Sequence, residues 1–299
     1  MVVAQMRGIG GAVGAVTRTG SLTRRFGVLT LVLCCLALIV RPAAAEIPPG
    51  LENSRITFLY VAPQSSQYQA LYERLVKRQV LEELKAFLAP LRLPRKLALN
   101  LRECGEVDAR YTRAEGVVVC YEYIDFVERL APKDTTPEGF TRAEGIIGAV
   151  VEVMLHEIGH AVFDILDVPV YGREEDAADQ IAGFIMLQFS RELAVFAIKG
   201  AAWSFLAQDQ EWQGTRFADE HGTGRQRFYN YLCLGYGGAP DAFQSIVDKG
   251  LLPAPRAANC PREYQLVRNA FGKTILPFID PDLMKLVQAT RWLRQEEMK

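Results

Sequence analysis

Apolar residues follow two spacings along the chain, and each spacing predicts a different kind of element. Short apolar runs bounded by turn residues predict strands over Ile56–Val61, Leu97–Leu101 and Val117–Tyr121, with an edge strand near Asp108–Thr112. Between the first two runs, leucines at helical spacing predict one long amphipathic helix over Gln67–Leu91. The N-terminal part of the chain is therefore expected to contain a small sheet.

Most of the remaining chain has helical spacing, interrupted by Gly- and Pro-rich links. Strands first and helices later predict an α+β fold, with a small mixed sheet packed on the helix 142–166 and a mainly helical C-terminal half. We expect one domain over residues 46–299, comprising the sheet and the long helix (46–172) and a helical subdomain (173–299). The expected helices are Tyr123–Leu130, Arg142–Leu166, Glu174–Leu206, Gly224–Leu234, Ala239–Lys249, Pro261–Phe271 and Pro281–Glu297.

Two of the chain's three histidines lie one helical turn apart in the predicted helix 142–166, where the residues from His156 to His160 read His-Glu-Ile-Gly-His. Positions i and i+4 share one face of a helix, so both imidazoles can bind one metal ion. Glu157 is then placed beside the metal, as a general base for the attacking water must be. The flanking residues are apolar, and a pair of hydrogen-bonded core histidines is the alternative.

An acidic cluster follows at the start of the next predicted helix. Glu175 and Asp179 are again spaced i, i+4, so both can face the metal helix. We assign Glu175 as the third metal ligand and Asp179 as the acceptor that orients a ligating histidine. Glu174 and Asp176 are expected to be solvated charges at the positive end of the helix dipole. An acidic first turn with no metal role is the alternative.

The pattern His156-Glu157-x-x-His160 with Glu175-x-x-Ala178-Asp179 resembles the gluzincins, zinc metallopeptidases in which a glutamate from a later helix is the third ligand. Within them, the chain is similar to an uncharacterised family of secreted bacterial "putative metallopeptidases". The resemblance implies a zinc-dependent hydrolase fold and does not itself supply a substrate. From the site we expect one Zn²⁺ per chain and a peptide or protein substrate. The stretches that carry the similarity outside the ligand region are Glu103–Gly105, Val119–Glu122, His221–Gly222 and Gln226–Asn230.

One position departs from the gluzincin pattern. Gluzincins often carry an Asn-Ala pair on the edge strand that holds the substrate backbone, and the corresponding pair here is Asp108-Ala109. An aspartate cannot donate the amide hydrogen bond, so the resemblance does not extend to this substrate contact.

The third histidine, His221, lies in a polar turn together with Asp219 and Glu220. Peptide hydrolysis passes through a tetrahedral oxyanion, which a second electrophile beside the metal would stabilise. His221 is a provisional candidate for that role, with an acidic neighbour keeping it charged, and a surface histidine is the alternative. The rival donors are three tyrosines, Tyr229, Tyr231 and Tyr236.

Residues 1–45 predict a cleavable signal peptide. They are basic at the start, continue into the apolar run Phe26–Val40, which is too short for a comfortable membrane span, and end in Ala43-Ala44-Ala45. We expect cleavage after Ala45 and a periplasmic or secreted bacterial protein. The pair Arg24-Arg25 leaves twin-arginine export open beside Sec export, and an uncleaved signal anchor, which would attach the protein to a membrane, is the alternative.

Removing residues 1–45 changes the charge and therefore the possible partners. It takes away five arginines and no acidic residue, which leaves 29 basic and 35 acidic residues and a net charge near −6. This balance argues against nucleic acid or an anionic membrane as the partner. The oligomeric state is not predicted by any pattern in the chain.

Four cysteines remain after residue 45: Cys104, Cys120, Cys233 and Cys260. An even count in an oxidising compartment predicts two disulfides, for which three pairings are possible. We favour Cys104–Cys120, which would join neighbouring strands, and Cys233–Cys260, which would close a Gly/Pro-rich loop. Four buried free thiols are the alternative.

Together these features favour an exported zinc-dependent hydrolase, a peptidase, in which His156, His160 and Glu175 hold the metal and Glu157 is the general base. The alternative is a zinc-binding periplasmic interaction or assembly protein whose site no longer turns over.

Overall fold

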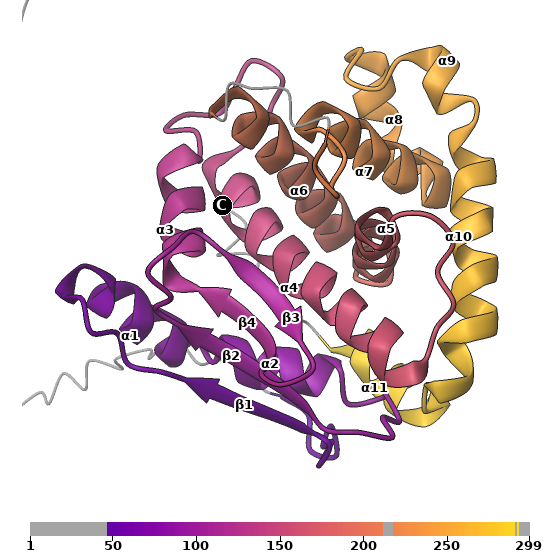
Figure 1. The fold of residues 1–299 in the computed structure, drawn as a ribbon. Helices are drawn as coiled ribbons and strands as arrows, with labels where there is room; N and C mark the ends of the chain where they lie inside the picture. Colours follow the sequence, from indigo (N-terminus) through magenta and orange to yellow (C-terminus); the bar gives the residue numbers. More distant parts are fainter. Residues whose placement is uncertain (1–46, 212–217, 291, 293–299) are drawn as a thin grey trace, which may run out of the picture. The chain divides into compact units, whose positions relative to one another are not determined.

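A four-stranded mixed sheet forms the N-terminal part of the fold, in the order β1-β2-β4-β3 (Figure 1). The strands are β1 (Ile56–Tyr60), β2 (Leu97–Arg102), β3 (Ala109–Thr112) and β4 (Gly116–Cys120). β2 pairs in parallel with both β1 and β4, and β3 is the antiparallel edge strand beside β4. Every residue of β4 is buried, which explains its continuous apolar run.

The computed structural model describes residues 47–211, 218–290 and 292, all within one compact unit. The predicted signal peptide and its cleavage position after Ala45 lie outside the described residues.

Helices follow the sheet, as predicted, and the α+β fold is confirmed. The helices are α1 (Gln69–Arg78), α2 (Val80–Phe87), α3 (Tyr121–Leu130), α4 (Arg142–Leu166), α5 (Glu174–Met186), α6 (Arg191–Glu211), α7 (Gly224–Gly238), α8 (Pro240–Asp248), α9 (Ala254–Ala257), α10 (Cys260–Thr274) and α11 (Pro281–Ala289), with short 3₁₀ turns at Ser66–Tyr68 and Leu276–Phe278.

Helix α4 has the predicted bounds and is the central helix of the core. Thr141 caps its start, accepting from the Glu144 N–H at 3.1 Å while the Glu144 carboxylate accepts from the Thr141 N–H at 2.8 Å. It ends at Asp167, which adopts the left-handed conformation (φ 54°). The helix is long and apolar enough to cross a membrane, but 72% of its most apolar window is buried inside the protein. It packs against the sheet, α5 and α6.

The predicted helix Gln67–Leu91 was wrong in one respect, because it is two helices. Gln79 adopts the left-handed conformation (φ 58°), ending α1 and starting α2. The Leu81 N–H, which an uninterrupted helix would bond internally, donates instead to the Tyr60 hydroxyl at 2.7 Å. The break therefore attaches α2 to the first strand of the sheet.

The predicted helix Glu174–Leu206 is also two helices, with the break between Met186 and Arg191. The Ser190 hydroxyl accepts from the Leu193 N–H at 3.3 Å and satisfies an N–H at the start of α6. With the break at this point, both α5 and α6 pack against α4.

The last predicted helix, Pro281–Glu297, is shorter than expected within the described residues. It ends at Ala289, because Thr290 is extended (ψ 142°). The remainder of the prediction, apart from Trp292, lies outside the described residues.

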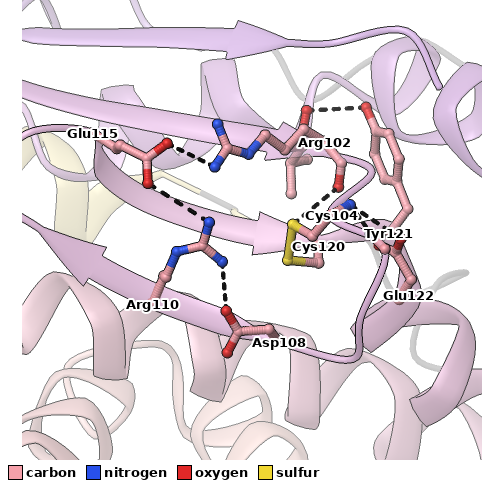
Figure 2. The surroundings of a disulfide bond; sticks show 10 residues. Arg102, Cys104, Asp108, Arg110, Glu115, Cys120, Tyr121 and Glu122 are labelled. Atoms are coloured by element: carbon pink, nitrogen blue, oxygen red, sulfur yellow. Dashed lines mark hydrogen bonds and ion pairs between the residues drawn. A yellow bond between two sulfur atoms is a disulfide. The ribbon is translucent and has the colours of Figure 1, made fainter. Parts of the chain in front are cut away.

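Both predicted disulfides are present. Cys104–Cys120 has a Cα–Cα distance of 5.6 Å, and Cys233–Cys260 one of 5.0 Å. The first lies where the chain enters the edge strand β3 (Figure 2). There the Glu122 carboxylate also accepts from the backbone N–H of Cys104 at 3.0 Å and of Gly105 at 2.6 Å. The disulfide and this carboxylate together fix the loop that precedes β3.

Candidate metal centre

All three histidines of the chain converge on one carboxylate oxygen. The distance from Glu175 Oε2 is 3.0 Å to His156 Nε2, 3.3 Å to His160 Nε2 and 2.7 Å to His221 Nε2. The Nε2 atoms of His156 and His160 are 3.2 Å apart. Residues from α4, from the first turn of α5 and from the turn before α7 are thus brought together.

Local packing of α5 on α4 explains this convergence. His156 is 3% exposed, on the inner face of α4. At the helix contact Gly159 lies against Ala178, where a Cβ atom on Gly159 would be in ordinary van der Waals contact, 3.4 Å from the Ala178 Cα. The two small residues let α5 pack closely on α4, with Glu175 in its first turn beside the histidines.

The orientation of His156 is fixed by Asp179, as predicted for that aspartate. His156 Nδ1 lies 2.9 Å from Asp179 Oδ1. Because a carboxylate only accepts, Nδ1 carries the proton and Nε2 is left to face Glu175. The Arg227 guanidinium in turn donates to both oxygens of Asp179, at 2.7 and 2.5 Å. Burial alone would raise the pKa of Asp179, and the charge of Arg227 reverses that shift and lowers the pKa.

Glu175 is the negatively charged group at the centre, and the three histidines around it stabilise its charge. Burial would raise the pKa of Glu175, but the hydrogen bonds from His156, His160 and His221 outweigh it and hold the pKa far below its usual range. Burial would lower the pKa of His156, and the contacts with Asp179 and Glu175 raise it to about 10. Ligand imidazoles must be neutral, so metal binding at this centre would displace protons.

The contacts of Glu174 differ from those expected from the sequence. It was expected to be a solvated charge, and its side chain is 55% exposed, but its Oε1 lies 2.8 Å from His160 Nδ1. It orients His160 as Asp179 orients His156. Helix α5 therefore supplies a separate carboxylate to each histidine, Asp179 to His156 and Glu174 to His160, besides the shared Glu175. Asp176 does pair at the surface, with Arg173 at 2.6 Å.

Glu157 lies beside the histidines and is 7% exposed. Among the described residues, the Glu157 carboxylate makes no hydrogen bond or ion pair. Burial raises the pKa of Glu157, and the nearby His156 and His160 partly oppose the rise. A carboxylate without a partner in such a place can accept a proton from a water molecule.

The residues present fit a zinc ion. One nitrogen each of His156 and His160 and one oxygen of Glu175 lie within 4.8 Å of one another. Two imidazoles and a carboxylate are the donor set of many catalytic zinc sites, and each imidazole here has the acceptor on its other nitrogen that such ligands need. The mutual contacts of the three donors would be replaced by bonds to the ion.

Residues 60–275 match the model of a protein family described as "Putative metallopeptidase". The chain belongs to this family. No curated protein and no solved structure matched the chain in the corresponding comparisons. The matched range includes every residue of the centre described above, so the family and the donor set point to the same class, a metal-dependent peptidase.

The sequence analysis missed one buried acidic residue beside the centre. Glu152 lies one turn before His156 on α4 and is 2% exposed. It accepts from the Tyr231 hydroxyl at 2.7 Å, and its Oε1 is 3.6 Å from Arg227 Nη2. The Arg227 guanidinium also lies 3.8 Å from the centre of the Phe205 ring. The available signal was an acid in an otherwise apolar helix, four residues before the first histidine.

A second group of side chains is spaced closely enough to hold a metal ion, but Arg227 already neutralises its carboxylates. Glu152, His156 and Asp179 each place one donor atom within 4.8 Å of the others. The guanidinium of Arg227, however, contacts both of these carboxylates. A third such group, Cys104, Cys120 and Glu122, has its two sulfur atoms joined in a disulfide.

The candidates for the second electrophile occupy different places. His221 is at the centre, and its Nδ1 and backbone N–H both lie close to Asp219 Oδ1, at 3.1 and 2.9 Å. Of its rivals, Tyr231 is committed to Glu152, and the Tyr236 hydroxyl contacts Gln244 at 3.4 Å. Tyr229 is exposed on α7. The hydrogen bond with Glu175 raises the pKa of His221.

The edge strand β3 is tied to the metal helix by Asp164, one turn after His160. Its Oδ2 accepts from the Tyr111 hydroxyl at 2.6 Å and from Arg95 at 3.1 Å, and Arg113 pairs with the same carboxylate. These contacts, with the disulfide at the start of β3, hold the free edge of the sheet beside α4.

Proposed function

We propose that the protein is an exported, zinc-dependent peptidase. The observation that carries this proposal is the convergence of three histidine Nε2 atoms on Glu175 Oε2, next to the buried and unpartnered carboxylate of Glu157. A core helix has no other evident reason to bury this set of groups on one face.

His156, His160 and Glu175 would hold one zinc ion. Bound there, zinc would polarise the scissile carbonyl and lower the pKa of the attacking water. Asp179 and Glu174 keep the two imidazoles in the tautomer that leaves Nε2 free for the ion.

Glu157 takes the proton from the attacking water and later gives it to the leaving amine. Burial raises the pKa of Glu157 above its usual value, which suits a group that must both accept and donate a proton. His221 donates from Nε2 to the oxyanion, with Asp219 holding its other nitrogen. This assignment gives each ionisable residue facing the centre one role.

The substrate backbone is proposed to lie along β3. The Cys120 N–H donates to the Asp108 carbonyl at 3.1 Å, and bonding alternates in an antiparallel pair. The backbone groups of Ala109 and Tyr111 therefore face away from β4, where a peptide can add as a further strand. The Asp108 carboxylate is held by Arg110 at 2.5 Å, so the contact that gluzincins make with an asparagine amide would fall to the backbone here (Figure 2).

Export rests on the predicted signal peptide of residues 1–45. Two disulfides are compatible with a periplasmic or extracellular location, because cytosolic conditions keep thiols reduced.

The test is degradation of an unstructured protein, β-casein, by wild type and Glu157→Gln, with zinc content measured on both. We expect cleavage by wild type alone and one zinc per chain in both proteins, because the glutamine amide keeps the shape of the side chain but cannot accept the proton. Equal cleavage by both proteins would contradict the mechanism. Zinc in both without cleavage of any tested substrate would favour the alternative of a zinc-binding interaction protein.

A further inference from the structure

The face of helix α4 opposite the histidines lines a cavity. At 100° per residue, Ile147, Val150, Val151 and Met154 point away from His156. They form one wall of a cavity of about 740 Å³, which α1, α2 and α3 close from the other side. The volume lies in the range of small-molecule sites, and none of the residues proposed for the metal centre lines this cavity.

The cavity is lined mostly by apolar side chains, with five charged residues among them. Leu84, Phe87, Phe189, Leu193 and Trp292 continue the apolar lining. The charged lining residues are three arginines and two glutamates, an excess of one positive charge: Arg74, Arg78, Arg142, Glu83 and Glu128.

Arg142 is the lining arginine available to an anionic ligand, since Arg78 is paired with Glu83. Arg74 is paired with Glu128. Arg142 makes no ion pair with any described residue, and donates instead to the backbone carbonyls of Ala131 at 2.9 Å and Glu128 at 2.8 Å. A guanidinium has five N–H donors, so Arg142 can still receive an anion.

We propose that this cavity, the acyl groove, binds a free long-chain fatty acid, with its carboxylate at Arg142 and its alkyl chain along Val150 and Met154. The excess of one positive charge among the lining residues complements a single carboxylate. An alkyl chain needs no hydrogen-bond partners in the apolar part, whereas a peptide would bring N–H and C=O groups that these side chains cannot satisfy.

The test is titration of the purified protein with 11-(dansylamino)undecanoic acid, followed by displacement with unlabelled ligands. We expect one saturable site per chain, and displacement by hexadecanoate that weakens about fourfold for each methylene removed. Hexadecan-1-ol, which has the chain without the charge, should compete about tenfold more weakly. Metal content and casein cleavage are measured separately, so failure of the groove and failure of the proposed peptidase are distinguishable.

Variants locate the site. Val150→Trp fills the groove from a half-buried position and should weaken probe binding more than tenfold. Arg142→Gln should remove the preference for the acid over the alcohol, and Arg142→Lys should keep it. Arg129→Gln is the matched control, because Arg129 pairs with Asp125 on α3 and does not line the groove. Thermal unfolding verifies that each variant is folded.

Three results would overturn the proposal. The first is the absence of saturable binding by folded wild type, and the second is binding unchanged in Val150→Trp. The third is binding that occurs only after residues 293–299 are removed, which would assign the groove to a segment of the chain itself.

Discussion

The two histidines of the metal helix are one turn apart, but their supports differ. His156 is oriented by Asp179, which is buried and locked by Arg227, with Glu152 and Tyr231 behind it. His160 is oriented by Glu174, whose side chain is 55% exposed. A buried charge network resists rearrangement but is costly to break, whereas an exposed contact is screened by solvent. We therefore expect His156 to be the rigid ligand and His160 the adjustable one.

The largest effect is expected from Arg227→Met. This change leaves the carboxylates of Asp179 and Glu152 buried without their cation, which costs about 3–5 kcal/mol of unfolding free energy. Urea unfolding monitored by circular dichroism measures the loss. Arg225→Met is the matched control on the same helix, because Arg225 is 71% exposed, and it should change stability by less than about 0.5 kcal/mol. Equal effects of the two variants would show that the network does not support the fold.

Asp179→Asn comes next. The amide keeps the shape of the carboxylate, but its NH₂ group would meet the donors of Arg227, so the orientation of His156 is lost. We expect zinc affinity to fall roughly 10–100-fold. Competition with a fluorescent zinc chelator measures it. An unchanged affinity would remove Asp179 from the account of the centre.

The pH dependence of stability separates the metal-free from the zinc-loaded protein. The pKa of His156 is raised to about 10 in the folded protein, above the 6.5 of a free histidine. Its contribution to stability is therefore fully present below pH 6.5 and is lost as the pH rises through about 10. Metal-free protein should melt at a lower temperature at pH 9.5 than at pH 6.5. Protein saturated with zinc should show less of this decrease, because its imidazoles are already neutral. Identical profiles with and without zinc would contradict the ligand assignment.

Glu174→Gln should have the smallest effect. The Gln side chain can still accept from His160 Nδ1, and the position is largely exposed. We expect zinc affinity to change by less than about fivefold and the melting temperature to stay the same, since exposed charge contacts are worth about 1 kcal/mol or less. The chelator competition used for Asp179→Asn gives the comparison directly. An effect as large as that of Asp179→Asn would mean that the two histidines are equally supported.

The sequence predicted those features that depend on local spacing. The bounds of α4 were predicted from a long apolar run at helical spacing, and the disulfide pairing from neighbouring strands and a loop. The i, i+4 spacings of His156 with His160 and of Glu175 with Asp179 predicted which side chains share a helix face. The structure places these faces against each other.

Features that depend on tertiary packing could not be predicted in this way. Gln79 breaks a helix because the Tyr60 hydroxyl, from a strand far along the chain, takes over a backbone N–H. Glu174 was assigned to solvent from its position on the helical wheel, but a long side chain at the first turn of α5 reaches back to His160. Glu152 contacts Arg227 and Tyr231, which lie on α7, and no spacing rule in the sequence connects α7 to α4.

The central claim is that His156, His160 and Glu175 hold one zinc ion. Its most direct test is the metal content of the purified protein by mass spectrometry, for wild type and Glu175→Ala in parallel. We predict one zinc per chain in wild type and far less in the variant after the same dialysis, with both proteins folded by circular dichroism. A folded wild type that contains no zinc after exposure to the metal, or a variant that retains zinc as tightly as wild type, would contradict the account.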